Sequence, residues 1–263
     1  MGSSPVSLDV RGPLATLTIS RAAKMNRLDL FAASALEQLV RNISEREEIR
    51  VLQITGEGEA FCGGVDLEYI AQIQAMGDVD SFRQFLRTGR NLLFLFRRMP
   101  QMVIAVVNGL ATGAGLSLVL ASDWSVASDK AFFGETAPSD GLFPGWTAHW
   151  LLEEYVGTAK STELAMLGQK LSAEEALDLG LVNRVVTSEN LVRCADQMGA
   201  RFCESPPLVL REIKRTIYEN HYRNCEENSE LEIEGQIKCF LSEDSRAGVL
   251  AALANRRPKF EGR

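Results

Sequence analysis

The stretch between Val103 and Asp123 constrains the fold more than any other part of the chain. The β-branched apolar run VIAVV leads into NGLATGAG, and the apolar segment LSLVLASD follows. This order predicts a buried strand, a tight glycine turn and a helix. The first turn of such a helix directs unpaired backbone N–H groups at whatever lies in front of it. Two interpretations are open: the turn holds an oxygen that gains negative charge during a reaction, or its glycines only allow close packing.

A second glycine-rich turn follows another apolar strand. Residues 51–55 read VLQIT, and GEGEAFCGGVDLEYI comes next, with Gly63 and Gly64 just before a helical segment that begins near Asp66. Two strand ends of this kind in one domain can place two backbone N–H groups around one point. The two turns together therefore favour a site for a developing negative charge.

Length and composition indicate one large α/β domain with a helical extension. The chain has 263 residues, of which 46% are hydrophobic, and this is enough for a substantial core. We expect a core domain over residues 1–200 and a helical region over 201–263. The net charge of -7 argues against a nucleic-acid partner, because phosphate binding needs a basic face.

Cysteine usage and hydropathy indicate the cellular compartment that we expect for the chain. The five cysteines lack CxxC spacing and predict neither a disulfide framework nor a metal site. A reducing cytoplasm is the simplest compartment for such a chain. No apolar run reaches the ~18 residues that a membrane span requires, so we expect no membrane association.

Apolar periodicity places most of the elements. Residues 6–10 and 14–19 read as a hairpin at a sheet edge, and the strand at 51–55 closes a βαβ unit with parallel strands. The expected helices cover residues 29–43, 66–76, 79–98, 146–155, 159–167, 173–179 and 189–204, and further strands cover 103–107, 124–127, 131–134 and 181–186. Residues 207–255 read as two or three amphipathic helices with more apolar positions than a solitary tail should expose, among them Leu208, Ile213, Ile217, Leu231, Ile237, Phe240 and Leu250.

Five motifs in order resemble the crotonase (enoyl-CoA hydratase/isomerase) superfamily. AFCGGVDL and NGLATGAGLSLVLASDW are similar to its two catalytic turns. RAAKMNRLDL resembles its first CoA-contacting loop, LSAEEALDLGLVNRVV its late helix and strand, and RRPKF its terminal helix. The resemblance covers nearly the whole chain. It implies an α/β spiral of ββα units with a C-terminal helical trimerisation region that packs over neighbouring subunits, in a homotrimer or a hexamer made of two trimers.

The resemblance implies that the backbone N–H groups of Val65 and Ala114 hold a thioester oxygen. The family's hydratases also use two glutamates, and these positions fall on Ser117 and Ala137 here. Neither side chain is a carboxylate base, so we do not expect the standard hydratase mechanism. Cys62 lies in the first turn with no histidine near it in sequence, and we do not expect it to be a nucleophile.

Four side chains are candidates for the missing acid–base groups. Asp140 and Glu135 lie in the aromatic, turn-rich loop ETAPSDGLFPGW, where each is either an acid–base group or a loop carboxylate. Tyr69 can donate a proton or simply pack, and Ser117 can bind a polar substrate group or bond within its own helix. Asp66 reads as a helix cap and His149 as a core or interface histidine.

The resemblance also implies where a coenzyme A arm would lie. The contacts fall on Lys24 and Met25, on the loop from Phe61 through Gly63 to Gly64, and on Lys259 and Phe260 near the C-terminus. Coenzyme A would be part of the substrate, and no separate cofactor is expected. If the acyl group is carried by an acyl carrier protein, the adenine site could be degenerate.

The expected function is the processing of an acyl-CoA or acyl-carrier-protein thioester through an enolate. Two carboxylates would repel a substrate with its own β-carboxylate, and their loss favours a decarboxylase, as in polyketide assembly, or an isomerase with a single acid. Hydrolysis of a thioester or β-diketone is an alternative. A non-catalytic scaffold that binds acyl-CoA or a protein is the competing class of function.

Overall fold

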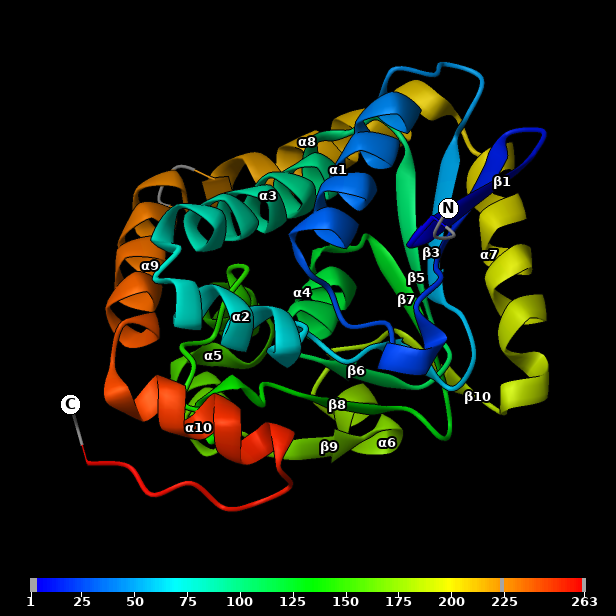
Figure 1. Cartoon of the computed structure of the whole chain (residues 1–263). Coiled ribbons are helices and arrows are strands. Elements are labelled where there is room, and N and C mark those ends of the chain that lie inside the picture. Colours follow the sequence, from blue (N-terminus) through cyan, green and yellow to red (C-terminus); the bar gives the residue numbers. More distant parts are fainter. Residues whose placement is uncertain (1–3, 223–224, 262–263) are drawn as a thin grey trace.

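A six-stranded sheet lies on the right-hand side of the molecule in Figure 1, between α7 and the other helices. The structure is a computed structural model that describes residues 4–222 and 225–261. In spatial order, the strands of this sheet are β1 (Val6–Arg11), β2 (Leu14–Ile19), β3 (Val51–Gly56), β5 (Met102–Val107), β7 (Trp124–Ser128) and β10 (Arg184–Val186). The hairpin β1–β2 is antiparallel and all other neighbours are parallel, as the sequence predicts.

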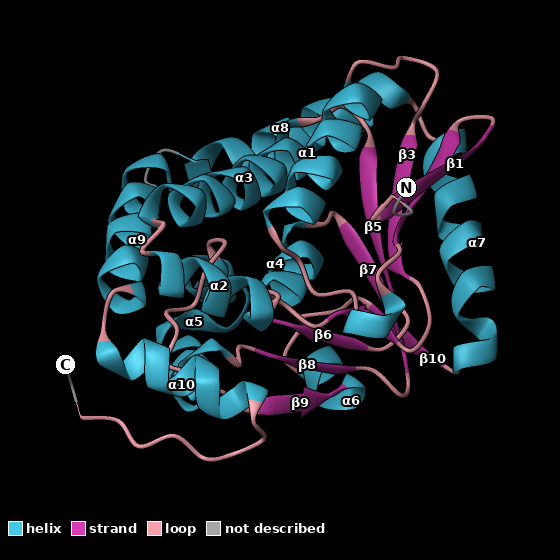
Figure 2. Cartoon of the chain, in the orientation of Figure 1, coloured by secondary structure: helices cyan, strands magenta, loops and turns pink. Residues whose placement is uncertain are grey.

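A smaller sheet lies beside the larger one and has four short strands (Figure 2). Its order is β4 (Ala60–Cys62), β6 (Leu110–Thr112), β8 (Phe132–Gly134) and β9 (Lys170–Ser172). Strands β3, β5 and β7 of the larger sheet are each followed in the chain by a strand of the smaller one. This repetition of two strands before a helical or irregular segment is the spiral of ββα units that the resemblance implied.

Helices enclose the sheets on both sides. They are α1 (Leu30–Ser44), α2 (Leu67–Met76), α3 (Val79–Arg98), α4 (Ala114–Ala121), α5 (Ala148–Leu167), α6 (Ala173–Asp178), α7 (Leu191–Glu204), α8 (Pro207–Tyr222), α9 (Cys225–Phe240) and α10 (Glu243–Leu253), with single 3-10 turns η1 (Ala22–Lys24), η2 (Ala137–Asp140) and η3 (Ser188–Asn190). Helix α7 packs on one face of the larger sheet, and α1, α3 and α4 lie on the other side (Figure 1).

The long helices begin where capping residues predict. Asp29 caps α1 by accepting a hydrogen bond from the Ala32 N–H at 2.8 Å, and Asp78 caps α3 by accepting from Ser81 at 3.0 Å. Each cap satisfies an N–H group that the first turn leaves without a partner. Helix α5 bends at Gly157, whose φ is 71°, and this divides it into the two segments expected from the sequence.

The last three helices pack on their own chain. Helix α9 contacts α3, and α10 contacts α2 and η2. The ring of Phe240 stacks on Phe82 with centroids 4.3 Å apart, and Gln74 donates to the Phe240 carbonyl oxygen at 3.2 Å and to Ser245 at 2.9 Å. The resemblance implied that this region lies over neighbouring subunits. These contacts show that α9 and α10 cover the interior of their own chain, and packing over neighbouring subunits stays a prediction.

Helix α8 is held to the core by a buried ion pair. Lys214 donates to Asp123 at 2.7 Å and to the carbonyl oxygen of Gln101 at 2.8 Å, and Asp123 also accepts from the Val103 N–H at 2.7 Å. The pair lies where β5 and β7 begin and holds α8 against that end of the two strands. Both charges are buried, so removing either side chain would leave the other as an unpaired charge in the interior.

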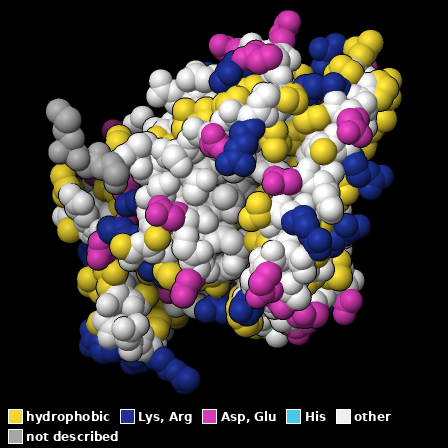
Figure 3. Space-filling model, turned by 90° about the vertical axis from the view of Figure 1, so that its right-hand side faces the viewer, with side chains coloured by type: hydrophobic (Ala, Val, Ile, Leu, Met, Phe, Trp, Pro, Cys, Tyr) yellow, Lys and Arg dark blue, Asp and Glu magenta, His cyan; other side chains and the backbone are white. Residues whose placement is uncertain are grey.

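The outer face of α8 remains apolar and open to solvent. Leu208, Val209, Ile213 and Ile217 are each between 50% and 59% exposed. Ile237 and Phe240, which the sequence grouped with them, are buried in the chain, and the side chain of Leu231 lies outside the described residues. On the face near β1 and α7, acidic and basic side chains are interspersed (Figure 3). No helix in the described ranges is long and apolar enough to cross a membrane.

Two groups of elements differ from the sequence expectation. The strands β4, β6 and β9 have three residues each, too few to show an alternating pattern, and their residues read as loops or turns. RRPKF was expected to form the terminal helix, and this is wrong: α10 ends at Leu253, and residues 256–261 have no helical structure.

Candidate functional site

The two glycine turns meet at the end of the smaller sheet. Gly64, with φ of 88°, follows β4, and Gly113, with φ of 53°, precedes α4. Both conformations favour glycine. A Cβ atom at Gly64 would lie 3.0 Å from the carbonyl oxygen of Thr112 and 3.9 Å from the Ala114 nitrogen. The turns are therefore in contact, as a shared binding point requires.

Close packing is also part of what these glycines do. A Cβ atom at Gly115 would lie 2.1 Å from the carbonyl oxygen of Cys62, so only glycine lets α4 approach β4. The packing interpretation of the NGLATGAG turn is thus confirmed, and packing at Gly115 fixes where the first turn of α4 lies.

The N–H groups of Val65 and Ala114 are both available. Leu28 donates to the Gly64 carbonyl oxygen at 2.8 Å and accepts from the Asp66 N–H at 2.8 Å, which holds the strand segment around Val65 in place. Within the described residues, neither the Val65 nor the Ala114 N–H has a hydrogen-bond acceptor. Two oriented backbone donors without partners, on touching turns, can stabilise an oxygen that becomes negative.

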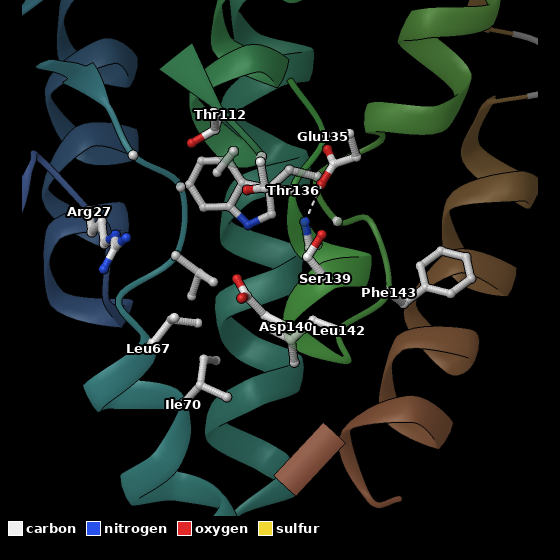
Figure 4. A pocket seen from close by; sticks show the side chains of 18 of the residues that line it. Arg27, Leu67, Ile70, Thr112, Glu135, Thr136, Ser139, Asp140, Leu142 and Phe143 are labelled. Carbon is white, nitrogen blue, oxygen red and sulfur yellow. Dashed lines mark hydrogen bonds between the residues drawn. The ribbon is translucent and has the colours of Figure 1, made fainter. Parts of the chain in front are cut away.

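A cavity of about 350 Å³ opens in front of these donors (Figure 4). Its apolar walls come from α2, α3 and the loop after η2, through Leu67, Ile70, Phe82, Phe85, Leu86, Leu142, Phe143 and Trp146. Polar and charged side chains, among them Arg27, Glu135, Asp140, Lys170 and Gln236, line the rest. An apolar wall with placed polar groups is typical of a pocket that binds a ligand in a fixed orientation.

Glu135 is the carboxyl group nearest to the second turn. It lines the cavity with 0% exposure, and its Oε1 accepts from the Ala137 N–H at 3.3 Å (Figure 4). A Cβ atom at Gly113 would lie 3.8 Å from Oε1. Its Oε2 has no partner within the described part of the chain. Burial raises the pKa of Glu135 to about 8, and the nearby charge of Glu232 adds to the effect.

Asp140 is a second carboxyl group in the cavity, closer to its mouth. Burial raises its pKa, while the positive charges of Arg27 and Lys170 act in the opposite direction. Arg27 lies across the cavity from Glu135 (Figure 4). The sequence analysis missed Arg27 and Lys170 as cavity residues. Arg27 follows the RAAKMN loop, and this position was the signal that could have indicated it.

Two sequence candidates lie elsewhere. Tyr69 is absent from the cavity lining: its ring packs on Phe85 and its hydroxyl donates to the Ser81 carbonyl oxygen at 3.4 Å. Burial raises the pKa of Tyr69 to about 12. Ser117 is fully buried inside α4 and does not line the cavity either. Ala137, at the other glutamate position, does line it.

Three further residues make contacts that belong to the fold and not to the cavity. Cys62 is buried in β4, and burial raises the pKa of its thiol to about 12, which makes it a poor nucleophile. Asp66 caps α2 by accepting from the Glu68 N–H at 3.1 Å, as expected. His149 has its Nδ1 3.7 Å from Glu232 and packs edge-on against Phe143, outside the cavity lining.

The residues expected to contact coenzyme A differ in burial and in the groups that they contact. Gly63 lines the cavity, whereas Phe61 is fully buried in the core. Met25 is 42% exposed at the end of η1. Lys24 donates to Asp66 at 2.9 Å and to Glu68 at 2.7 Å, so its charge is already paired.

The C-terminal pair is in an extended segment and not in a helix. Lys259 is exposed, with its Nζ 3.8 Å from Glu261. Phe260 is partly exposed and lies beside Gly141, where a Cβ atom would be 3.1 Å from its ring. Phe260 is therefore next to the loop that forms one side of the cavity.

The described residues contain no cluster of three or more His, Cys, Asp or Glu that could hold a metal ion. The four cysteines whose side chains are described are free, and the side chain of Cys225 lies outside that part.

The family model for Enoyl-CoA hydratase/isomerase matches residues 10–263. A 1,2-epoxyphenylacetyl-CoA isomerase from Escherichia coli is 32% identical over 249 residues, which are 94% of this chain and 95% of the relative. This chain belongs to the enoyl-CoA hydratase/isomerase family.

Other family members are similar over the whole length. A trans-2-decenoyl-[acyl-carrier-protein] isomerase from Streptococcus mutans is 27% identical over 263 residues, which are 100% of this chain and 100% of the relative. The crystal structure of an enoyl-CoA hydratase from Mycobacterium avium subsp. paratuberculosis superposes with a TM-score of 0.90 at 25% identity, over 99% of this chain and 100% of that one. The enoyl-CoA hydratase/isomerase family thus includes relatives that act on CoA and on carrier-protein thioesters.

Proposed function

We propose that the protein is an isomerase of enoyl thioesters that uses Glu135 as its single acid–base group. The observation that carries the proposal is the position of Glu135: fully buried, in the cavity, beside Gly113, with Oε2 unpartnered. A carboxyl group with a pKa of about 8 can give and take a proton near neutral pH.

The reaction balances with one carboxyl group. The Glu135 carboxylate takes a proton from C2 of a 3-enoyl thioester, and the electron pair moves onto the thioester oxygen, between the Val65 and Ala114 N–H groups. Protonated Glu135 then returns the proton to C4, and the electrons form a double bond between C2 and C3. No atom is gained or lost. Hydration by two glutamates is disfavoured because Ser117 and Ala137 stand at those positions.

The cavity favours isomerisation over decarboxylation. Its walls are largely apolar and aromatic, and its two cations, Arg27 and Lys170, share the mouth with Asp140. A β-carboxylate placed beside the oxyanion donors would face Glu135 instead of a cation. The cost of burying such a charge without a partner is large.

The test is a panel of thioesters on both coenzyme A and pantetheine. With a 3-hexenoyl thioester we expect a conjugated 2-enoyl product, followed by its ultraviolet absorbance and by mass spectrometry. Loss of CO₂ from a β-carboxylated thioester, with no isomerisation, would instead identify a decarboxylase, and release of free thiol would identify a hydrolase. Binding without turnover of any member would indicate a scaffold and overturn the proposal.

We also propose that the chain acts as an oligomer, a trimer or a pair of trimers. The exposed apolar face of α8, formed by Leu208, Val209, Ile213 and Ile217, supports association, because an apolar surface of this kind is costly to leave in water. Sedimentation velocity of the wild type should give a mass of three or six chains. A monomer at micromolar concentration would contradict this.

A further inference from the structure

One end of the cavity has two polar groups that the proposed reaction does not use. They belong to Trp146, which follows the loop after η2, and to Gln236, from α9. Trp146 is 2% exposed, and its Nε1 has no hydrogen-bond partner in the described ranges. A buried indole N–H without an acceptor is uncommon, and it indicates a donor that a ligand can satisfy.

The position of Trp146 is fixed by the backbone and by α3. Trp146 and Thr147 both have φ of 56°, a left-handed conformation that a bulky side chain adopts only when its surroundings hold it. A Cβ atom at Gly89 would lie 2.0 to 2.2 Å from three atoms of the indole, Nε1 among them, so the ring packs directly on the α3 backbone at Gly89. The ring of Phe85 is 5.3 Å away. The indole is therefore a rigid wall of the cavity.

Glu232 sets the orientation of the second group. Its Oε1 accepts from the Thr147 N–H at 3.0 Å and from Nε2 of Gln236 at 2.9 Å. Because the amide nitrogen of Gln236 faces Glu232, its Oε1 is the atom directed at Gly145, where a Cβ atom would be 2.8 Å away. Gly145 is the neighbour of Trp146 in the chain, and Gly145, Trp146 and Gln236 all line the cavity.

We infer that the acyl group of the substrate carries a hydroxyl that binds between these two groups. A hydroxyl is the small group that both accepts and donates, and it would accept from Trp146 Nε1–H and donate to Gln236 Oε1. Phe85, Leu86 and Phe143, which also line the cavity, are apolar. The inference rests on the proposed function and names its substrate class: hydroxylated acyl thioesters.

The test measures binding and not turnover. The probes are the pantetheine thioester of hexanoic acid and four isomers of it with one hydroxyl at C3, C4, C5 or C6, titrated calorimetrically into the wild-type protein. Pantetheine is common to coenzyme A and carrier proteins. We expect one isomer to bind about ten- to a hundredfold more tightly than hexanoyl pantetheine, because it satisfies a donor that is otherwise unpaired.

Variants separate hydrogen bonding from packing. Trp146→Phe keeps the aromatic ring but removes the N–H, and it should reduce the preference to less than about threefold. Gln236→Leu should do the same and leaves the indole of Trp146 unchanged. The matched control is Phe143→Leu, an apolar change in the same cavity, which should alter binding of both probes alike and leave their ratio intact.

Three results would overturn the inference in distinguishable ways. If hexanoyl pantetheine binds and no hydroxylated isomer binds better, the hydroxyl site is wrong while the thioester enzyme stands. If none of the five thioesters binds, the proposed function fails together with it. A preference that survives unchanged in both Trp146→Phe and Gln236→Leu would show that other residues recognise the hydroxyl.

Discussion

The Glu135→Gln variant should become more stable relative to the wild type as the pH rises. In the folded chain, the pKa of Glu135 is raised to about 8 by burial, from an ordinary value of 4.5. Between these two values the unfolded chain has lost the proton and the folded chain still holds it. The unfolded state then binds fewer protons, so the free energy of unfolding falls with increasing pH.

The size of the effect follows from the pKa difference. Stability changes by about 1.4 kcal/mol per pH unit where the two states differ by one proton. From about pH 6 to about pH 7.5, this carboxyl group should therefore lower the stability of the wild type by about 2 kcal/mol. Glutamine has no proton to lose and nearly the same shape. Glu232 and all other titratable groups are present in both proteins, so their effects largely cancel in the difference.

Urea denaturation at several pH values and constant ionic strength measures this difference. The free energy of unfolding of Glu135→Gln, relative to that of the wild type, should be lowest near pH 5. It should increase steadily from there to pH 7.5. Parallel stability curves over this range would refute the reasoning. They would mean that burial does not raise the pKa of Glu135 in the folded protein above its ordinary value.

Three further results are expected. The kcat/KM of isomerisation should rise about tenfold per pH unit below pH 8 and level off above it, because the base is the ionised form of Glu135; a rate independent of pH would exclude this base. Ala114→Pro removes one oxyanion donor at a position where helices accept proline, and should reduce kcat/KM by about 10²–10³ with the urea midpoint retained; near-normal activity would contradict the role of this N–H. Lys214→Ala leaves Asp123 buried and unpaired, and should lower the free energy of unfolding by about 3–5 kcal/mol in urea denaturation; a loss below about 1 kcal/mol would show that α8 is held by other contacts.

Local sequence patterns predicted the elements that are long enough to show them. Some features depend only on residues that are close together in the sequence. They are the apolar stripe of α3, the capping aspartate of α1 and the glycine turns at Gly64 and Gly113. The three-residue strand β6 lies inside the turn NGLATG, and its pairing with β4 and β8 depends on segments far away in the chain. Such short strands form because the sheet is completed by their neighbours.

The site was predictable in part for the same reason. Val65 and Ala114 were implied by the resemblance to the crotonase superfamily, and the two turns that carry them are in contact in the structure. The sequence could name Glu135 only as one of several carboxylates, because its burial depends on the fold. Tyr69 and Ser117 were close along the chain to the two donors, but the helical turn directs them elsewhere. Gln236 comes from α9, and no local pattern links it to the cavity.

The most direct test of the account is proton exchange at C2 of a saturated acyl thioester in deuterium oxide, followed by mass spectrometry. Exchange requires only a base at C2 and two donors on the thioester oxygen. The wild type and Asp140→Asn should incorporate deuterium, and Glu135→Gln should not. Exchange that continues unchanged in Glu135→Gln would contradict the assignment of the acid–base group, and no exchange in the wild type would contradict the oxyanion site itself.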